Sequence, residues 1–247
     1  MIAIRGLAKT LGGRRVLAGV DLDVRSGESL VVMGRSGTGK SVLLKHVVGL
    51  MRPDAGHVEV DGRDVVGMHP RELDEVRQRM GMLFQGGALF DSLTVGENVA
   101  LPLRQHTRMR VAEVRARVRE RLEWVGLEGV EDMKPASLSG GMRKRVGLAR
   151  AIVMDPATIL NDEPTTGLDP IMADVIDQLI RSMQRRLGVT TIAVTHDLAS
   201  AYKVADRIAM LHDGRVVFTG TVAETRATTD PLVRQFIEGS SSGPIRV

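Results

Sequence analysis

Residues 34–41 read Gly-Arg-Ser-Gly-Thr-Gly-Lys-Ser, which fits the glycine-rich loop that cradles phosphate groups. Small residues let successive backbone N–H groups point at phosphate oxygens. Lys40 would place a positive charge on the β- and γ-phosphates, and the Ser41 hydroxyl is an oxygen ligand of the kind that Mg²⁺ prefers. The sequence therefore predicts a nucleoside triphosphate site with Mg²⁺, formed by Gly34, Arg35, Ser36, Gly37, Thr38, Gly39, Lys40 and Ser41.

An acidic pair, Asp162-Glu163, follows the short apolar strand expected at 158–160. The carboxyl ends of strands in open α/β sheets are where ligands bind. We expect Asp162 to hold the metal through water and Glu163 to orient or deprotonate the attacking water. An Asp-Glu pair alone also fits a turn or a helix N-cap, but a strand end followed by Pro164 favours the catalytic interpretation.

Two further polar side chains follow expected strands. Gln85 comes after the strand at 81–84, where its amide can contact Mg²⁺ or the attacking water and sense the γ-phosphate. His196 comes after the strand at 190–194, where it can donate a hydrogen bond to γ-phosphate oxygens. Taken alone, such a glutamine is more often an ordinary surface residue, and such a histidine is more often structural.

A run of small residues opens another expected helix, at Leu138-Ser139-Gly140-Gly141-Met142. Ser139 suits the N-cap, and a helix N-terminus with small residues receives anions well. Taken alone, the run is better interpreted as only a loop and a helix cap.

The elements around these motifs alternate between strands and helices, which predicts an α/β fold with a mainly parallel sheet covered on both faces. Residues 94–153 are mostly helical and form a second lobe. We expect one domain at 1–239, with a core lobe of about 1–85 and 154–239, a helical lobe of about 86–153, and a flexible tail at 240–247. Expected strands are 1–6, 16–24, 29–33, 57–60, 81–84, 158–160, 190–194 and 207–211; expected helices are 41–50, 70–80, 108–125, 170–187 and 198–204.

Composition narrows the class of protein. An apolar share of 43% over 247 residues excludes wholesale disorder, and the lack of cysteine excludes a disulfide framework or a thiolate metal site. No apolar run approaches the roughly 18 residues that span a bilayer, so we expect a soluble, cytoplasmic protein whose membrane work comes through a partner. A net charge of +4 with 2% aromatic residues argues against nucleic acid as a partner.

These motifs, in this order, resemble an ATP-binding-cassette (ABC) ATPase subunit over nearly the whole chain. The resemblance implies a P-loop NTPase fold with an N-terminal antiparallel β subdomain and an inserted α-helical subdomain. It also implies a head-to-tail dimer with ATP and Mg²⁺ as cofactors, in which Ser139, Gly140 and Gly141 of one copy meet the γ-phosphate held by Lys40 of the other. In this resemblance Gln85 is the Q-loop glutamine, Leu138–Met142 the signature, Gly167-Leu168-Asp169 the D-loop and His196 the switch histidine.

Three stretches, 84–90, 135–146 and 230–236, are similar to ATPases of the Mla and mammalian-cell-entry (MCE) type. That similarity implies transport of phospholipid or another hydrophobic lipid of the cell envelope, driven at the cytoplasmic face of the inner membrane through an integral membrane permease. It also implies a lipid-binding substrate-capture protein as a partner. Another cargo, or a non-transport regulator that signals through a membrane partner, remains open. An ABC ATPase of DNA repair or translation is disfavoured by the single cassette and the lack of a heptad run.

The permease is expected to dock over residues 85–103, with Phe90, Leu93 and Val95 exposed; the alternative is that these side chains form part of the core of the helical lobe.

Two features depart from the ABC pattern. Residues 9–14 contain no aromatic to stack on adenine, so we expect apolar contact from Leu11 and Val16 and weak discrimination between bases. Asn161 is polar in a strand expected to be buried, and it needs a hydrogen-bond partner.

Overall fold

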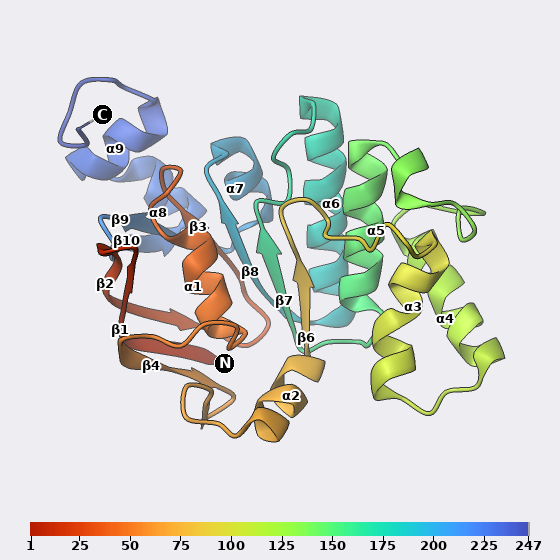
Figure 1. Cartoon of the computed structure of the whole chain (residues 1–247). Coiled ribbons are helices and arrows are strands. Elements are labelled where there is room, and N and C mark those ends of the chain that lie inside the picture. Colours follow the sequence, from red (N-terminus) through yellow and green to blue (C-terminus); the bar gives the residue numbers. More distant parts are fainter. Residues whose placement is uncertain (247) are drawn as a thin grey trace. The chain divides into compact units, whose positions relative to one another are not determined.

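The computed structural model describes residues 1–246, and the chain divides into two compact units (Figure 1). The first unit is formed by Met1–His69 and Ile192–Val247, and the second by Pro70–Thr191. Residues 70–85 and 154–191 therefore group with the helices of the second unit, which differs from the lobe boundaries expected from the sequence. Strand β8 (Thr190–Thr195) crosses the boundary between the units.

An antiparallel sheet opens the first unit. Its four strands lie in the order β2-β1-β4-β5, and each neighbouring pair is antiparallel. The antiparallel β subdomain expected from the family resemblance is confirmed. The strands are β1 (Ile2–Leu11), β2 (Arg14–Val24), β4 (Ala55–Val60) and β5 (Arg63–Asp64).

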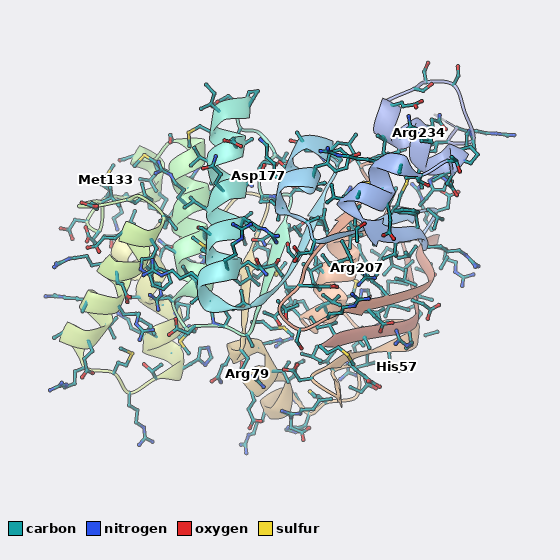
Figure 2. The ribbon with its side chains drawn as sticks, turned by 180° about the vertical axis from the view of Figure 1, so that it is seen from behind. His57, Arg79, Met133, Asp177, Arg207 and Arg234 are labelled. Atoms are coloured by element: carbon teal, nitrogen blue, oxygen red, sulfur yellow. The ribbon has the colours of Figure 1, made fainter. Side chains whose placement is uncertain are left out.

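A second group of strands in the first unit carries the phosphate loop. Strand β3 (Ser29–Met33) is buried along its whole length and pairs in parallel with β9 (Arg207–His212). Strand β9 pairs on its other edge with the antiparallel β10 (Arg215–Thr221). An ion pair of 3.0 Å joins Glu28, just before β3, to Arg207, the first residue of β9. Arg207 is labelled in Figure 2. The helices of this unit are α1 (Lys40–Val47), α7 (Leu198–Val204), α8 (Val222–Ala227) and α9 (Pro231–Glu238).

The second unit combines a parallel strand pair with most of the helices. Strand β6 (Met80–Leu83) pairs in parallel with β7 (Thr158–Asp162). Helices α3, α4 and α5 contact one another and gather in the yellow-to-green part of Figure 1. The helices are α2 (Pro70–Gln78), α3 (Val95–His106), α4 (Val111–Trp124), α5 (Gly140–Ile152) and α6 (Pro170–Leu187).

Strand β6 and helix α5 approach each other through glycines. A side chain at Gly81 would collide with the backbone carbonyl of Ala151. A Cβ at Gly147 would lie 2.8 Å from Leu83 Cδ1 and 3.4 Å from Gly87 Cα, both closer than ordinary van der Waals contact or at its limit. Only glycine at 81 and 147 lets this helix lie so close to the strand and to the loop that follows it.

Several elements differ from the sequence expectation at their ends. Strand β7 extends to Asp162, so the acidic pair begins inside the strand. Helix α4 starts at Val111 rather than 108, because the Arg110 backbone N–H donates to Glu113 and the residue serves as the N-cap. Helix α2 ends at Gln78, since β6 already begins at Met80. Strand β10 and helices α8 and α9 were not predicted.

The tail expected to be flexible returns to α9 over residues 240–246, whereas Val247 lies outside the described residues. The Gln235 side chain accepts the Ile245 N–H at 2.6 Å and donates to the Ile245 carbonyl at 3.1 Å. Ile245 is buried. The guanidinium of Arg35 then donates to the Arg246 carbonyl at 2.7 Å, so the end of the chain lies against the phosphate loop.

Candidate functional site

The phosphate loop joins β3 to α1, which is the strand–loop–helix context that such a loop requires. The ammonium of Lys40 donates to the backbone carbonyls of Gly34 at 2.9 Å and of Arg35 at 3.0 Å. Its own loop therefore orients Lys40 at the centre of the turn, where the phosphate groups of a nucleotide would lie.

Two glycines of this loop are required by close approach of other strands. A Cβ at Gly34 would collide with the Leu211 carbonyl of β9. Gly39 has a φ of +101°, and a Cβ there would lie 3.0 Å from Val16 Cγ1 of β2. Val16 thus lies against the loop, as a nucleotide contact requires. Leu11 lies at the end of β1, at the turn of the β1–β2 hairpin, with its side chain exposed.

His196 lies between β8 and α7 in the first unit, with its side chain exposed. The next residue, Asp197, is the N-cap of α7 and accepts the Ala199 N–H at 2.8 Å. The Thr195 hydroxyl accepts the Asp197 N–H at 3.0 Å. The backbone around the predicted switch histidine is therefore fixed by its two neighbours.

The acidic pair lies in the second unit. Asp162 is the last residue of β7, and both carboxylates are buried. Glu163 has a φ of +48°, a left-handed conformation that is uncommon for a residue with a Cβ. The Thr166 hydroxyl donates to Glu163 Oε2 at 3.0 Å. The strand end thus turns sharply at the residue predicted to act on water.

A buried lysine that sequence reasoning missed lies beside this pair. Lys144 of α5 is 4% exposed, and its ammonium donates to the backbone carbonyls of Gln85 and, at 3.0 Å, of Glu163. Burial lowers the pKa of Lys144 to about 8, although the Asp162 and Glu163 carboxylates act in the opposite direction. Helical spacing does not single it out in the sequence, because Arg145 stands at the same spacing from the buried Ala149 and Ile152 as Lys144 does from Leu148 and Ala151.

The signature motif begins α5. Ser139 is the N-cap, and its hydroxyl accepts the Met142 N–H at 3.2 Å, so the predicted cap is confirmed. A Cβ at Gly141 would lie 2.6 Å from the Met172 side chain of α6. Asp169 of the D-loop caps α6 by accepting the N–H groups of Ile171 and Met172, each at 3.0 Å. The two motifs therefore start two helices that touch each other.

A pocket of about 400 Å³ lies next to the Q-loop segment in the second unit. Phe90 lines it and is 52% exposed. Val95, expected to be exposed here, is instead fully buried, because it is the first residue of α3 and faces the helical core. Leu93 is half-buried. Further lining residues are Asp74, Arg77, Met80, Met82, Phe84, Leu101, Pro102, His106, Arg150 and Met154.

The structure places the predicted site residues in two groups, one in each unit. The first holds residues 34–41 with Val16 and His196, and the second holds Gln85, Asp162, Glu163, residues 138–142 and residues 167–169. The groups that would bind Mg²⁺ are a hydroxyl, an amide and a carboxylate, from Ser41, Gln85 and Asp162. Each is a hard oxygen donor of the kind that this cation takes together with phosphate oxygens, so the chemistry of each side chain fits the metal.

A phosphate loop between strand and helix, a buried acidic strand end and a capped Ser-Gly-Gly helix start define an ATP-hydrolysing cassette. The family model described as ABC transporter matches residues 17–166, and the chain belongs to that family. None of the helices within residues 1–246 is long and apolar enough to cross a bilayer.

Relatives and solved structures extend this family assignment over the whole chain. The probable ribonucleotide transport ATP-binding protein mkl of Mycobacterium leprae is 44% identical over 99% of this chain and 70% of its own length. The intermembrane phospholipid transport system ATP-binding protein MlaF of Haemophilus influenzae is 42% identical over 100% of this chain and 93% of its own length. The dimeric structure of MJ0796, a bacterial ABC transporter cassette, superposes with a TM-score of 0.84 at 36% identity, over 90% of this chain and 99% of that one.

Proposed function

We propose that the chain is the ATPase subunit of a lipid transporter of the Mla and MCE type and drives a separate membrane permease. The observation that carries this proposal is the 42% identity to an MlaF protein over 100% of this chain and 93% of that relative. Full-length coverage matters, because the stretch 135–146 runs through the signature into the first half of α5, and the stretch 230–236 begins at the N-cap of α9.

In the proposed site, the phosphate loop binds the β- and γ-phosphates of ATP, with Lys40 as the point charge. Ser41, Asp162 and Gln85 would hold Mg²⁺, which would neutralise the charge that develops on the phosphates. Glu163 orients or deprotonates the attacking water, and His196 hydrogen-bonds the γ-phosphate. The burial of Asp162 and Glu163 supports these roles, because charges act more strongly away from bulk water.

The proposal includes a head-to-tail dimer of two copies, which ATP closes and hydrolysis opens. The similarity to the dimeric cassette MJ0796 supports it. So does the signature helix, because Ser139 and the glycines after it leave backbone N–H groups at a helix N-terminus. In the dimer these groups would meet the γ-phosphate bound by the partner's phosphate loop.

The pocket beside Gln85 is the proposed docking site of the permease. Its lining mixes apolar side chains with Arg77, His106 and Arg150, and Phe90 projects at its rim. Aromatic side chains and arginines are enriched at protein interfaces, so Phe90 beside Arg77 and Arg150 supports docking at this pocket. Docked there, the subunit would work at the cytoplasmic face of the inner membrane, and a lipid-binding capture protein would deliver cargo to the same system.

The names of the relatives point to two cargoes, since one is named for ribonucleotide transport and another for phospholipid transport. We favour lipid because the phospholipid relative is matched over nearly its full length. The native complex, purified from its membrane, decides the question by identification of the membrane protein and of the molecule bound to it. Co-purified phospholipid supports lipid transport. A ribonucleotide cargo, or a partner that is a cell-wall regulator without cargo, contradicts it.

The catalytic assignment is tested with Glu163→Gln in the full chain. ATP binding should be preserved and turnover should fall by about 100-fold or more, because general base catalysis is removed while the charge-neutral amide keeps the shape of the site. If this variant hydrolyses ATP at the normal rate, Glu163 is not the base. Thr166→Val, which removes only the hydroxyl that contacts Glu163 Oε2, is the matched control and should retain most of the turnover.

A further inference from the structure

We propose that Lys144 is a positioning residue for ATP hydrolysis, which fixes the backbone of Gln85 and of Glu163 with one buried ammonium group. This inference rests on the proposed role of Glu163 in the reaction. Lys144 itself touches neither phosphate nor water in the proposed mechanism. Its effect would pass through the two backbone carbonyls that it holds.

The ammonium group of Lys144 contacts backbone carbonyls of two predicted site residues. A buried ammonium needs an acceptor for its protons, and here the acceptors are main-chain oxygens of the two residues predicted to flank the reacting water. The carboxylates of Asp162 and Glu163 also attract this cation electrostatically. One side chain thus joins the signature helix to the Q-loop and to the end of β7.

Glu163 is the residue that most needs such support. Its φ of +48° is a conformation that persists only where surrounding contacts hold it. The carbonyl held by Lys144 belongs to the same residue, so the contact restrains the ψ angle and with it the direction of the Glu163 side chain. A displacement of about 1 Å in a catalytic group can lower a rate on the order of 100-fold.

Helix α5 also contacts the residues that follow Gln85, so Lys144 is not their sole link to this helix. Arg150 donates to the carbonyls of Gly87 and Ala88, both at 2.8 Å. The segment after Gln85 is therefore anchored to α5 even without Lys144. The contact to Glu163 acts on the residue proposed as the base, so it is the contact whose loss we expect to matter most.

The same helix offers a matched control. Arg145 is a partly buried cation next to Lys144 in sequence, and burial lowers its pKa too. It donates to the carbonyls of Val125, at 3.4 Å, and Gly126, at 3.0 Å, at the end of α4. Arg145→Met therefore removes a cation and its carbonyl contacts from α5 without touching Gln85 or Glu163.

The test measures steady-state ATP hydrolysis and nucleotide affinity for Lys144→Met and Arg145→Met in the full chain. For Lys144→Met we expect kcat to fall roughly 10- to 100-fold, while ATP affinity changes by less than about threefold, because the phosphate loop is untouched. Arg145→Met should keep kcat within about twofold. Lys144→Gln, measured in parallel with Arg145→Gln, retains one donor and gives the same comparison if the methionine variant does not fold.

Two results would overturn the inference. One is a normal kcat in folded Lys144→Met; the other is an equal loss in the Lys144 and Arg145 variants, which would mean general destabilisation. The double variant Lys144→Met with Glu163→Gln adds a check. Once Glu163 is no longer a base, its position cannot affect the rate, so the double variant should hydrolyse ATP as fast as Glu163→Gln alone. Losses that multiply contradict positioning. Normal turnover by Glu163→Gln defeats the proposed function instead, so the two failures are distinguishable.

Discussion

The Asn98 side chain holds both backbone groups of Phe90. Its Oδ1 accepts the Phe90 N–H at 2.8 Å, and its Nδ2 donates to the Phe90 carbonyl at 3.1 Å. The same amide donates to the Thr94 carbonyl at 2.9 Å. A fully buried residue of α3 therefore fixes the loop that presents an exposed ring to the proposed docking pocket.

Asn98→Leu should destabilise the protein. Leucine matches asparagine closely in shape, but it leaves the backbone groups of Phe90 without their partner. We expect a loss of about 2–4 kcal/mol in the free energy of unfolding, measured by urea denaturation of the full chain. An unchanged unfolding midpoint would show that water replaces the amide without penalty and that Asn98 does not order the loop.

Asn161→Leu is the same substitution at another buried position, and here we expect no loss of stability. Asn161 is fully buried in β7, yet its amide finds no hydrogen-bond partner among residues 1–246. An unpaired buried amide is unfavourable, so leucine should be neutral or stabilise the protein by about 1 kcal/mol. A loss as large as that of Asn98→Leu in the same urea experiment would contradict this reading and show that the amide has a partner in solution.

The stability of the protein should depend on pH through His46. This ring is buried in α1, where its Nδ1 lies 2.7 Å from the Val42 carbonyl. Burial lowers the pKa of His46 below its ordinary value, and nearby Lys9 acts in the same direction while Asp54 opposes it. The unfolded chain therefore binds this proton more readily than the folded one. Stability is full above the unfolded pKa of about 6.5 and falls as the pH drops below it.

Unfolding measured at pH 7.5 and at pH 5.5 checks this expectation. His46→Phe keeps a ring and cannot titrate, so it should lose less stability than the wild type between the two pH values. Equal losses in both proteins would assign the pH dependence to other groups.

The protein should discriminate only weakly between ATP and GTP in binding. The predicted adenine contacts are the aliphatic side chains of Leu11 and Val16, and we expect affinities for ATP and GTP within about tenfold of each other, since base stacking, worth about 1–3 kcal/mol, is absent. Leu11→Tyr should strengthen ATP binding by about 1 kcal/mol, measured with a fluorescent nucleotide. Leu50→Tyr, at another exposed leucine of the same unit, is the control and should change nothing. A strong native preference for ATP would contradict the assignment.

The sequence was most informative where local chemistry decides the structure. Helix α6 begins at Pro170 and ends at Leu187 as predicted, because Asp169 caps its start and Gly188 takes the left-handed conformation at its end. The limits of β3 and α7 were also predicted correctly. The phosphate loop could be found because its glycines, its lysine and its serine follow one another at a fixed spacing within residues 34–41.

Features that depend on tertiary contacts were not accessible in this way. Strand β10 alternates between exposed and partly buried residues at a sheet edge, so it carries only a weak apolar pattern. Lys144 stands in a basic run, Arg143-Lys144-Arg145, and only the packed helix shows which of the three side chains is buried. Val95 was placed on the surface because the sequence does not reveal which face of α3 meets the helical core.

The return of residues 240–246 to the phosphate loop has a practical consequence. The chain contains no cysteine, so a single thiol introduced in place of Arg246 would accept one fluorophore at a defined place. Because Arg35 holds the carbonyl of that residue, the dye would sit within reach of the nucleotide and its emission would follow loading and release in real time. Bulky substitutions within residues 240–246 would crowd the phosphate loop, since this segment contacts Arg35.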